Sequence, residues 1–353
     1  MVPRKDSKYL PPKPISLKTI GDYLDLSPAT ISLVLNNAPG VRSIPQKTRD
    51  RVIEAARKFD YRPSYSARAL RNRQTYSVGV LVPELSDVYT AMVMSGLEEV
   101  LIEEGYFYLT ASHRRKADLV EEYAGLLMER SVEGIIAIDT MLTQPYSVPV
   151  VNVAGHRRIE GVTNIELDHG RAAELAMRHL HQLGHRQIAF MHGQAHSADS
   201  EPRWKTMTDA ARALNLEIRP ELTIRLVAND ASPELGYPVV SELLTRGNPF
   251  TALVCYNDIS AIGAIRAFRD HGIRVPEDVS IIGFDDIQAA AYYYPSLTTI
   301  RQPMHAMGST AARLLLEWLR GKKVPPAQVT VLPELIIRES TMPPNPKPWM
   351  KPR

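Results

Sequence analysis

The sequence predicts an α/β protein in which a small three-helix module precedes a larger, bilobal domain built on two parallel sheets. With 353 residues, the chain is longer than one hydrophobic core usually organises. Residues 1–75 hold 15 of the 42 basic residues and 6 of the 39 acidic ones, a formal charge of +9, whereas the rest of the chain carries −6. From residue 76 onwards, short apolar runs alternate with amphipathic segments, which is typical of strands that alternate with helices.

Two closely spaced helix starts mark the small module. Ser16 and Ser27 stand at N-cap positions, where a serine hydroxyl accepts a hydrogen bond from the first turn of a helix. Pro28 occupies the favoured first position of the second helix. Asp25 lies in the turn between the helices and tolerates left-handed backbone better than a bulky residue would. We therefore expect two helices joined by a short turn.

A third helix is expected from about Gln46. Four apolar residues recur at helical spacing and form its buried stripe: Val52, Ala55, Ala56 and Phe59. The three helices would share one small core as a helix-turn-helix. A three-helix protein-interaction module would show the same caps and the same stripe, so periodicity leaves both interpretations open.

The second helix, from Ser27 to about Asn36, is the element expected to enter the major groove of DNA. Thr30 and Ser32 can bond to phosphates or base edges, while Ala29 and Leu33 can contact thymine methyl groups. The basic charge favours a phosphate partner, because each Lys or Arg that neutralises a phosphate releases a counterion. Charge alone also fits a solvated basic tail.

The motifs of this module are LKTI (residues 17–20), LSPATISLVLN (26–36), TRDRV (48–52) and YRP (61–63). With them the chain resembles the lac and galactose repressor family. The resemblance implies a hinge helix at 64–71 that folds on operator DNA and inserts Leu70 into the minor groove. The DNA-binding residues that it implies are Thr19, Ser27, Pro28, Ala29, Thr30, Ser32, Leu33, Asn36, Ser64, Ala67, Arg68 and Leu70.

The small module also departs from its relatives. Leu33 stands where many of them carry Arg or His, which predicts a different operator sequence. The segment 38–44 is about three residues longer than usual, and Pro45 replaces a helix-capping serine. The turn before the third helix is therefore expected to be unusual.

In the larger domain, short apolar runs predict buried strands at 78–82, 107–110, 134–138, 150–153, 187–191, 222–226, 252–255 and 280–283. Helices are expected between them, for example at 91–104, 170–182 and 259–271. Two lobes separated near Asp168 would form a cleft at the carboxyl ends of their strands, where open α/β sheets bind ligands. Segment 140–147 is too short for a helix before the next strand.

Motifs continue through this domain: VLVP (80–83), LGHRQIAF (183–190), ND (257–258), GFDD (283–286), LTTIRQP (297–303) and IRES (337–340). They resemble the periplasmic-binding-protein-like core with which the same family senses sugars or other small metabolites. The resemblance implies effector contacts from Arg203, Asn257 and Asp285, and from Asp230. By residue type alone, these are also ordinary strand ends and a surface cation.

Further wall residues of the cleft are expected after strand ends: Glu84, Asp87, Tyr89, Asp139 and His192. Each also fits an ordinary loop. Ala154 replaces a frequent effector-binding aspartate, and Ala231 replaces an aromatic residue that often stacks on the ligand. The identity of the effector therefore stays open.

The expected domain boundaries follow from these patterns. They are a tail at 1–14, a helix-turn-helix headpiece at 15–62, a hinge at 63–75, a core at 76–342 and a second tail at 343–353. Within the core, lobe 1 takes 76–167 and 302–331, and lobe 2 takes 168–301 and 332–342.

Three other interpretations compete. For an enzyme, we find no HExxH, phosphate-loop or nucleophile-elbow motif, so no catalytic residue, metal or cofactor is predicted beyond the effector. A solute-binding protein would carry a signal peptide and no basic headpiece. A DNA-binding regulator controlled by a protein partner, with no small-molecule effector, stays open because of Ala154 and Ala231.

We therefore expect a homodimeric transcription repressor that binds a pseudo-palindromic double-stranded DNA operator under the control of a small molecule such as a sugar. The single cysteine, Cys255, excludes an intramolecular disulfide and fits a reducing cytoplasm. No apolar stretch predicts a membrane span. The protein is expected to be cytoplasmic, and nucleoid-associated when bound to DNA.

Overall fold

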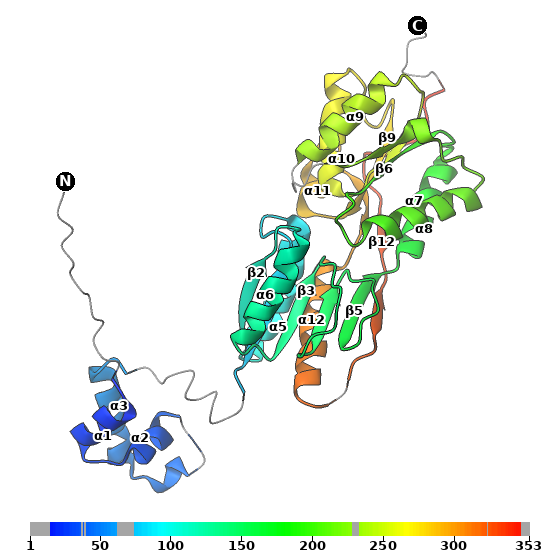
Figure 1. The fold of residues 1–353 in the computed structure, drawn as a ribbon. Coiled ribbons are helices and arrows are strands. Elements are labelled where there is room, and N and C mark those ends of the chain that lie inside the picture. The colour runs from blue at the N-terminus through cyan, green and yellow to red at the C-terminus, as the bar shows by residue number, and fades with distance from the viewer. Residues whose placement is uncertain are drawn as a thin grey trace, which may run out of the picture. The chain divides into compact units, whose positions relative to one another are not determined.

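The computed structural model describes residues 15–36, 38, 40–61, 74–227, 233–322 and 324–346. It divides into two compact units, Met1–Thr75 and Tyr76–Arg353. Figure 1 shows the elements of both units. Among the described helices, none combines the length and the apolar character needed to cross a bilayer.

The headpiece contains α1 (Leu17–Leu24), α2 (Pro28–Leu35), a 3-10 turn η1 (Val41–Ser43) and α3 (Gln46–Lys58). Both predicted caps are confirmed, because the Ser16 and Ser27 hydroxyls each accept a backbone N–H three residues ahead at 3.1 Å. Asp25 has the expected left-handed backbone, with φ of 55°. The turn η1 occupies the longer segment before α3, and Pro45 makes no side-chain cap there.

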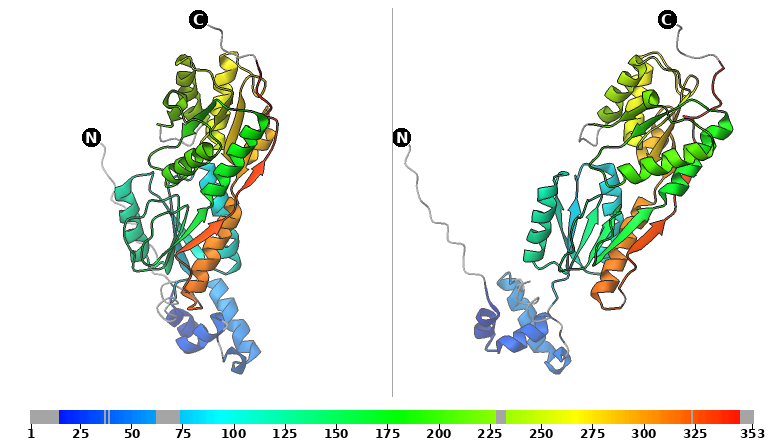
Figure 2. Two further views of the ribbon diagram at one scale, coloured as in Figure 1. Left: turned by 90° about the vertical axis from the view of Figure 1, so that its right-hand side faces the viewer. Right: turned by 45° about the vertical axis from the view of Figure 1, so that its right-hand side comes forward.

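Lobe 1 is built on a six-stranded sheet in the order β11-β5-β4-β3-β1-β2, in which every pair of neighbours is parallel. Its strands are β1 (Ser77–Val82), β2 (Phe107–Ser112), β3 (Gly134–Ile138), β4 (Val150–Val153), β5 (Val162–Leu167) and β11 (Gln328–Val331). Its helices are α5 (Val88–Glu103), α6 (Ala117–Glu129) and α12 (Met304–Leu319). They cover the two faces of the sheet (Figure 2).

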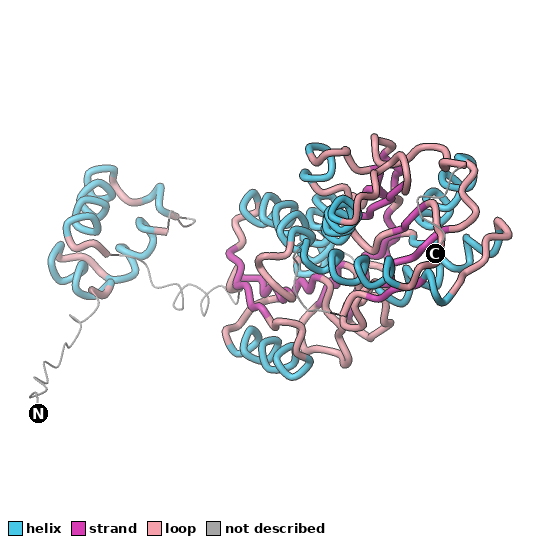
Figure 3. Tube along the Cα trace, turned by 90° about the horizontal axis from the view of Figure 1, so that it is seen from above, coloured by secondary structure: helices cyan, strands magenta, loops and turns pink. Residues whose placement is uncertain are grey.

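Lobe 2 is built on a second six-stranded sheet in the order β12-β10-β9-β8-β6-β7, parallel except where β12 meets β10. Its strands are β6 (Ile188–His192), β7 (Thr223–Arg225), β8 (Ala252–Val254), β9 (Ser280–Asp285), β10 (Thr298–Arg301) and β12 (Glu334–Ile336). Its helical segments are α7 (His169–Leu183), α8 (Ser200–Ala213), η2 (Pro220–Leu222), η3 (Pro233–Leu235), α9 (Gly236–Thr245), α10 (Asp258–Asp270) and α11 (Gln288–Tyr292). Strands again lie inside and helices outside (Figure 3).

The predicted strands are all present, but the sequence missed β5, β10, β11 and β12. These four mix polar with apolar residues, so they lack a continuous apolar run. The prediction that these strands are all buried was wrong for β2 and for the edge strand β7, in which Arg225 is exposed. β2 lies at the edge of its sheet, where Phe107 is 62% exposed. The segment between β3 and β4 contains no helix, as expected.

The chain crosses between the lobes three times: from β5 to α7, from β10 to α12 and from β11 to β12. Asp168 lies at the first crossing and caps α7 by accepting the Arg171 N–H at 2.8 Å. Because parallel strands place their carboxyl ends at one edge of a sheet, the loops that follow them gather in the cleft between the lobes.

Candidate functional site

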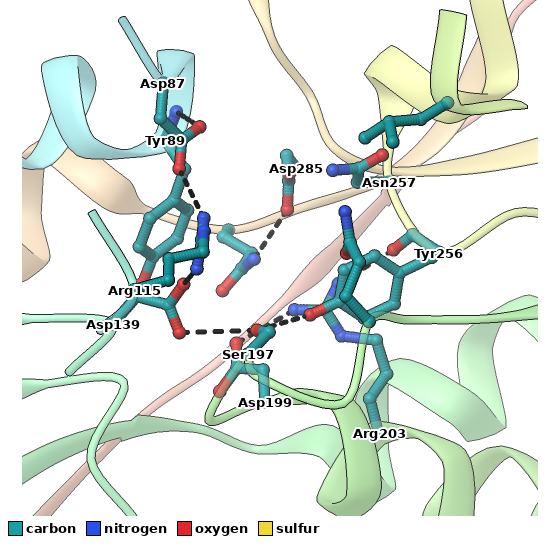
Figure 4. A pocket seen from close by; sticks show the side chains of 13 residues that line it. Asp87, Tyr89, Arg115, Asp139, Ser197, Asp199, Arg203, Tyr256, Asn257 and Asp285 are labelled. Carbon is teal, nitrogen blue, oxygen red and sulfur yellow. Dashed lines mark hydrogen bonds and ion pairs between the residues drawn. The ribbon is translucent and has the colours of Figure 1, made fainter. Parts of the chain in front are cut away.

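A cleft between the lobes encloses about 520 Å³, a volume that includes space open to solvent. Thirteen described side chains line it: Asp87, Tyr89, Arg115, Asp139, Gln194, Ser197, Asp199, Arg203, Leu235, Tyr256, Asn257, Asp285 and Gln302. Figure 4 shows how they surround the cavity. Nearly all are polar, so the cleft suits a polar ligand.

The backbone is strained where several strands end at this cleft. Arg115, Asp139 and Asp285 have φ values of 58°, 41° and 113°, in the region that favours glycine. Such conformations cost about 1–3 kcal/mol each and persist where the surrounding structure holds them. Their clustering at one cavity is typical of a functional site.

Arg203 is the central cation of the lobe 2 wall. Its side chain is buried, and its guanidinium carbon lies over the Phe284 ring, 3.8 Å from the ring centroid. Its Nη1 donates to the Tyr256 carbonyl at 2.8 Å, and its Nη2 donates to Asp199 Oδ2 at 2.9 Å. These contacts fix the guanidinium in one orientation at the cleft.

Arg115 and two carboxylates form the facing wall in lobe 1. Arg115 donates to Asp139 at 2.9 Å and approaches Asp87 at 3.5 Å. Asp139 also accepts the backbone N–H of Ala198 at 3.1 Å and the hydroxyl of Ser197 at 3.3 Å, so it connects the two lobes. Burial raises the pKa of both Asp87 and Asp139, and Arg115 opposes that shift.

Asp285 and Asn257 complete the lobe 2 wall. Asp285 is the last residue of β9, and it accepts a hydrogen bond from Gln302 Nε2 at 2.6 Å. Burial raises the pKa of Asp285 to about 7, against the opposing effects of Arg203 and Gln302. Asn257 caps α10 through its Oδ1, which accepts the Ser260 N–H at 2.9 Å. Its amide NH₂ is therefore the part available to a ligand.

Three side chains of the cleft carry a buried polar atom that lacks a hydrogen-bond partner among the described residues. They are the Tyr89 hydroxyl, Arg203 Nε and Gln302 Oε1. A buried donor or acceptor without a partner costs about 1–3 kcal/mol, so such groups normally bind a water or a ligand. The cleft thus offers both donors and acceptors to a bound molecule.

The structure brings together most, but not all, of the predicted effector residues. Arg203, Asn257, Asp285, Asp87 and Tyr89 line the cleft, and so does Asp139. Asp230 and Ala231 lie outside the described residues. Glu84 is not among the lining residues.

The prediction that His192 lines this cleft was wrong, because the structure places its side chain elsewhere. It is the last residue of β6, and its ring stacks on Trp204 with centroids 4.8 Å apart. Successive strand residues point to opposite faces of a sheet, so the end of a strand does not by itself place a side chain in the cleft. His192 lines a neighbouring, more apolar cavity instead.

The sequence prediction missed several wall residues: Arg115, Gln194, Ser197, Asp199, Tyr256 and Gln302. Tyr256 could have been found, since it directly precedes Asn257 after a predicted strand. Asp199 had no comparable signal, because it lies in the loop before α8 and reaches the cleft only in the folded chain.

In the headpiece, α2 packs one apolar side against the other two helices. Ile31 and Val34 are buried, whereas Pro28 and Ala29 are exposed and Leu33 is half-buried. The polar side chains make local bonds: Thr19 and Ser27 take part in caps, Thr30 Oγ1 lies 2.9 Å from Ser27 Oγ, and Asn36 donates to the Ser32 carbonyl at 2.8 Å. The predicted hinge residues Ser64, Ala67, Arg68 and Leu70 lie outside the described residues.

Comparison with known proteins identifies both units. Residues 16–64 match the family of bacterial regulatory proteins, lacI family, and residues 177–341 match a periplasmic binding protein-like domain. The HTH-type transcriptional repressor PurR of Haemophilus influenzae is 31% identical over 337 residues, which cover 92% of this chain and 98% of PurR. PurR of Yersinia pestis is 30% identical over 334 residues, 92% of this chain and 96% of that protein.

Solved structures with a similar fold support the same identification. The lac repressor dimer bound to operator and the anti-inducer ONPF has a TM-score of 0.83 and 25% identity, covering 94% of this chain and all of that one. A complex of the transcriptional regulator CelR with cellobiose has a TM-score of 0.67, 25% identity and coverage of 92% and 99%. A lacI-family regulator from Enterococcus faecium with bound ribose has a TM-score of 0.68 and 26% identity, and the match covers 76% of this chain and all of that one. The chain belongs to the lacI family of bacterial regulatory proteins and is a DNA-binding transcription regulator rather than an enzyme.

Proposed function

We propose that the chain is a homodimeric, cytoplasmic repressor that binds a pseudo-palindromic operator and senses a small polyhydroxylated molecule, most simply a sugar, in the interlobe cleft. The observation that carries the effector proposal is the set of buried polar atoms without partners on Tyr89, Arg203 and Gln302. The domain division proposed is the one expected from the sequence, with headpiece 15–62, hinge 63–75 and core 76–342.

A sugar suits this cleft because each hydroxyl both donates and accepts a hydrogen bond. Arg203 supplies donors, ionised Asp285 supplies acceptors and Asn257 supplies a donor. The relatives captured with cellobiose and with ribose support the same ligand class. Asp87, Tyr89 and Arg115 are proposed as the lobe 1 contacts.

For DNA, we propose that α2 enters the major groove and presents Ala29, Thr30 and Leu33 to base edges. Thr19, Ser27, Pro28, Ser32 and Asn36 would fix its position on the backbone, and Ser64, Ala67, Arg68 and Leu70 would form the hinge. Two copies related by a twofold axis would bind two half-sites. The structure of the lac repressor as a dimer bound to operator supports a dimer as the DNA-binding form.

A thermal-shift screen of sugars and related metabolites tests the effector proposal. A ligand that binds the folded chain raises its melting temperature by mass action, by an amount that grows with ligand concentration. DNA that the chain binds is first selected from a random pool. Each ligand found by thermal shift is then added to the complex, and the affinity of the chain for this DNA is measured again. We expect at least one ligand that both raises the melting temperature and changes the affinity for DNA. The proposal would be contradicted if no ligand did so and a partner protein controlled DNA binding instead.

The effector affinity is expected to depend on pH through Asp285. Its pKa of about 7 means that the carboxyl loses its proton, and becomes a full acceptor, between pH 6 and 8. Effector affinity should therefore rise about tenfold over this interval. Asp285 holds in the folded chain a proton that the unfolded chain releases near pH 4, so its contribution to the free energy of unfolding falls as pH rises from 4 to 7. Calorimetry at three pH values checks this, and Asp285→Asn should remove the dependence.

Replacing Gly193 with Ala is expected to weaken the effector by about tenfold, because overpacking costs on the order of 1–3 kcal/mol. A Cβ at this position would lie 2.4 Å from the Tyr256 ring, which lines the cleft. Gly125→Ala is the matched control, since its Cβ would meet nothing within 4 Å. Equal effector affinities for the two variants would show that the position of Tyr256 does not matter.

A further inference from the structure

Beside the cleft, two histidines and an aspartate from three separate segments converge. His156 follows β4 in lobe 1, His169 begins α7 at the first crossing, and Asp199 precedes α8 in lobe 2. Asp199 Oδ1 lies 2.6 Å from His156 Nε2 and 3.2 Å from His169 Nε2. One possible ligand atom from each residue lies within 4.8 Å of the other two.

The geometry points to a binding site for one divalent first-row transition ion, such as Zn²⁺, with His156 Nε2, His169 Nε2 and Asp199 Oδ1 as its ligands. Two imidazoles and one carboxylate are a common ligand set for such ions. Ligand atoms around a tetrahedral Zn²⁺ lie about 3.3 Å apart with bonds of ~2.0–2.1 Å. The distance from His169 Nε2 to Asp199 Oδ1, 3.2 Å, is close to that spacing. His156 Nε2 and Asp199 Oδ1 lie 2.6 Å apart, so these two side chains would have to separate by about 0.7 Å to admit the ion.

The surroundings of the cluster favour an ion. Asp199 stands at the N-cap position of α8, yet its side chain makes no cap bond. Its Oδ2 accepts from Arg203 at 2.9 Å, which leaves Oδ1 facing both histidines. Glu166 lies 3.5 Å from His156 Nδ1, on the far side of that ring, as in the carboxylate–histidine–metal arrangement that orients ligating histidines.

Burial is also compatible with a bound ion. The side chains of His169 and Asp199 are 5% and 7% exposed, and the Nδ1 of His169 has no hydrogen-bond partner among the described residues.

An ion at this position would join the lobes, because His156 belongs to lobe 1 and Asp199 to lobe 2. It would also hold the carboxylate that orients Arg203. Metal and effector would therefore influence each other's affinity, and the influence is reciprocal. The regulator would then respond to a metal ion as well as to a small molecule.

Isothermal titration of Zn²⁺ into the tag-free, chelator-treated full chain tests the site, with Mg²⁺ as a hard-cation control. We expect one Zn²⁺ per chain, no binding to this site in His156→Gln or His169→Gln, and unchanged binding in His181→Gln on the same helix as His169. Glu166→Gln should weaken binding about 10–100-fold, as outer-shell changes do. Circular dichroism and DNA binding verify that each variant is folded.

The proposal is overturned if the wild-type chain does not bind Zn²⁺. It is equally overturned if His156→Gln and Glu166→Gln, both folded, bind Zn²⁺ as tightly as the wild type. In either case the cluster is a hydrogen-bonded link between the lobes with a proton in place of the ion.

Discussion

Replacing Arg203 with Met is expected to lower effector affinity by at least about 100-fold, which corresponds to ~3 kcal/mol. Methionine keeps much of the apolar packing on Phe284 but removes every donor that the guanidinium presents to the cleft and to the Tyr256 carbonyl. Asp199 keeps its two histidine partners, so the carboxylate is not left unpaired. Operator affinity without effector should be unchanged, since the headpiece is a separate unit.

Arg212→Met is the matched control for this experiment. Arg212 lies on the same helix as Arg203, but its side chain is 66% exposed and its partner Asp209 is exposed as well. Exposed ion pairs contribute little, so this variant should bind effector like the wild type. Effector affinity within threefold of wild type in Arg203→Met would remove Arg203 from the proposed site. Calorimetry with the ligand found by thermal shift gives the affinities.

Replacing Ile31 with Ala is expected to reduce operator binding by roughly 100-fold or more by unfolding the headpiece. Ile31 is fully buried among a small set of apolar side chains, and truncation of a buried isoleucine costs about 2–5 kcal/mol. A core of this size rarely supplies more than about 3–5 kcal/mol, so the loss is comparable to the whole stability of the module. Effector binding should persist, because the cleft belongs to the other unit.

Ile53→Ala supplies the control, since Ile53 is 40% exposed on α3. Leu33→Ala tests the reading surface separately. It should keep the headpiece folded and weaken selected DNA more than random DNA, because Leu33 is proposed to contact a base. Fluorescence anisotropy with both DNAs measures the difference. Equal operator binding by Ile31→Ala and Ile53→Ala would mean that the headpiece does not depend on this core for DNA binding.

The sequence predicted the fold well where burial is uniform along an element. The strands β1, β3, β4 and β9 are buried at every position, and each consists mainly of apolar residues. The edge strands β11 and β12 have half-exposed residues, so polar positions interrupt the pattern. Their pairing partners are distant in sequence, and pattern alone does not supply them.

The cleft was predictable only in part. Asn257 and Asp285 follow predicted strands within recognisable motifs. Arg203 was predicted only because the chain resembles the lac and galactose repressor family. Arg115 and Asp199 take their roles from neighbours on the other lobe or on other loops, namely Asp139, His156 and His169. Arg115 meets Asp139 because β2 and β3 both flank β1 in lobe 1, whereas Asp199 meets His156 only through the crossings between the lobes. No local pattern reveals either arrangement.

The three crossings also determine how the lobes can move. A single connection would let the lobes twist and slide in several directions, whereas three adjacent chain segments resist twisting and leave mainly bending about the line through them. Movement between the lobes is then close to one rotational degree of freedom. Asp139 already joins the lobes through Ser197 and Ala198, so a molecule that strengthens or breaks this contact would change one angle. Ligands of different shape would then produce the same motion.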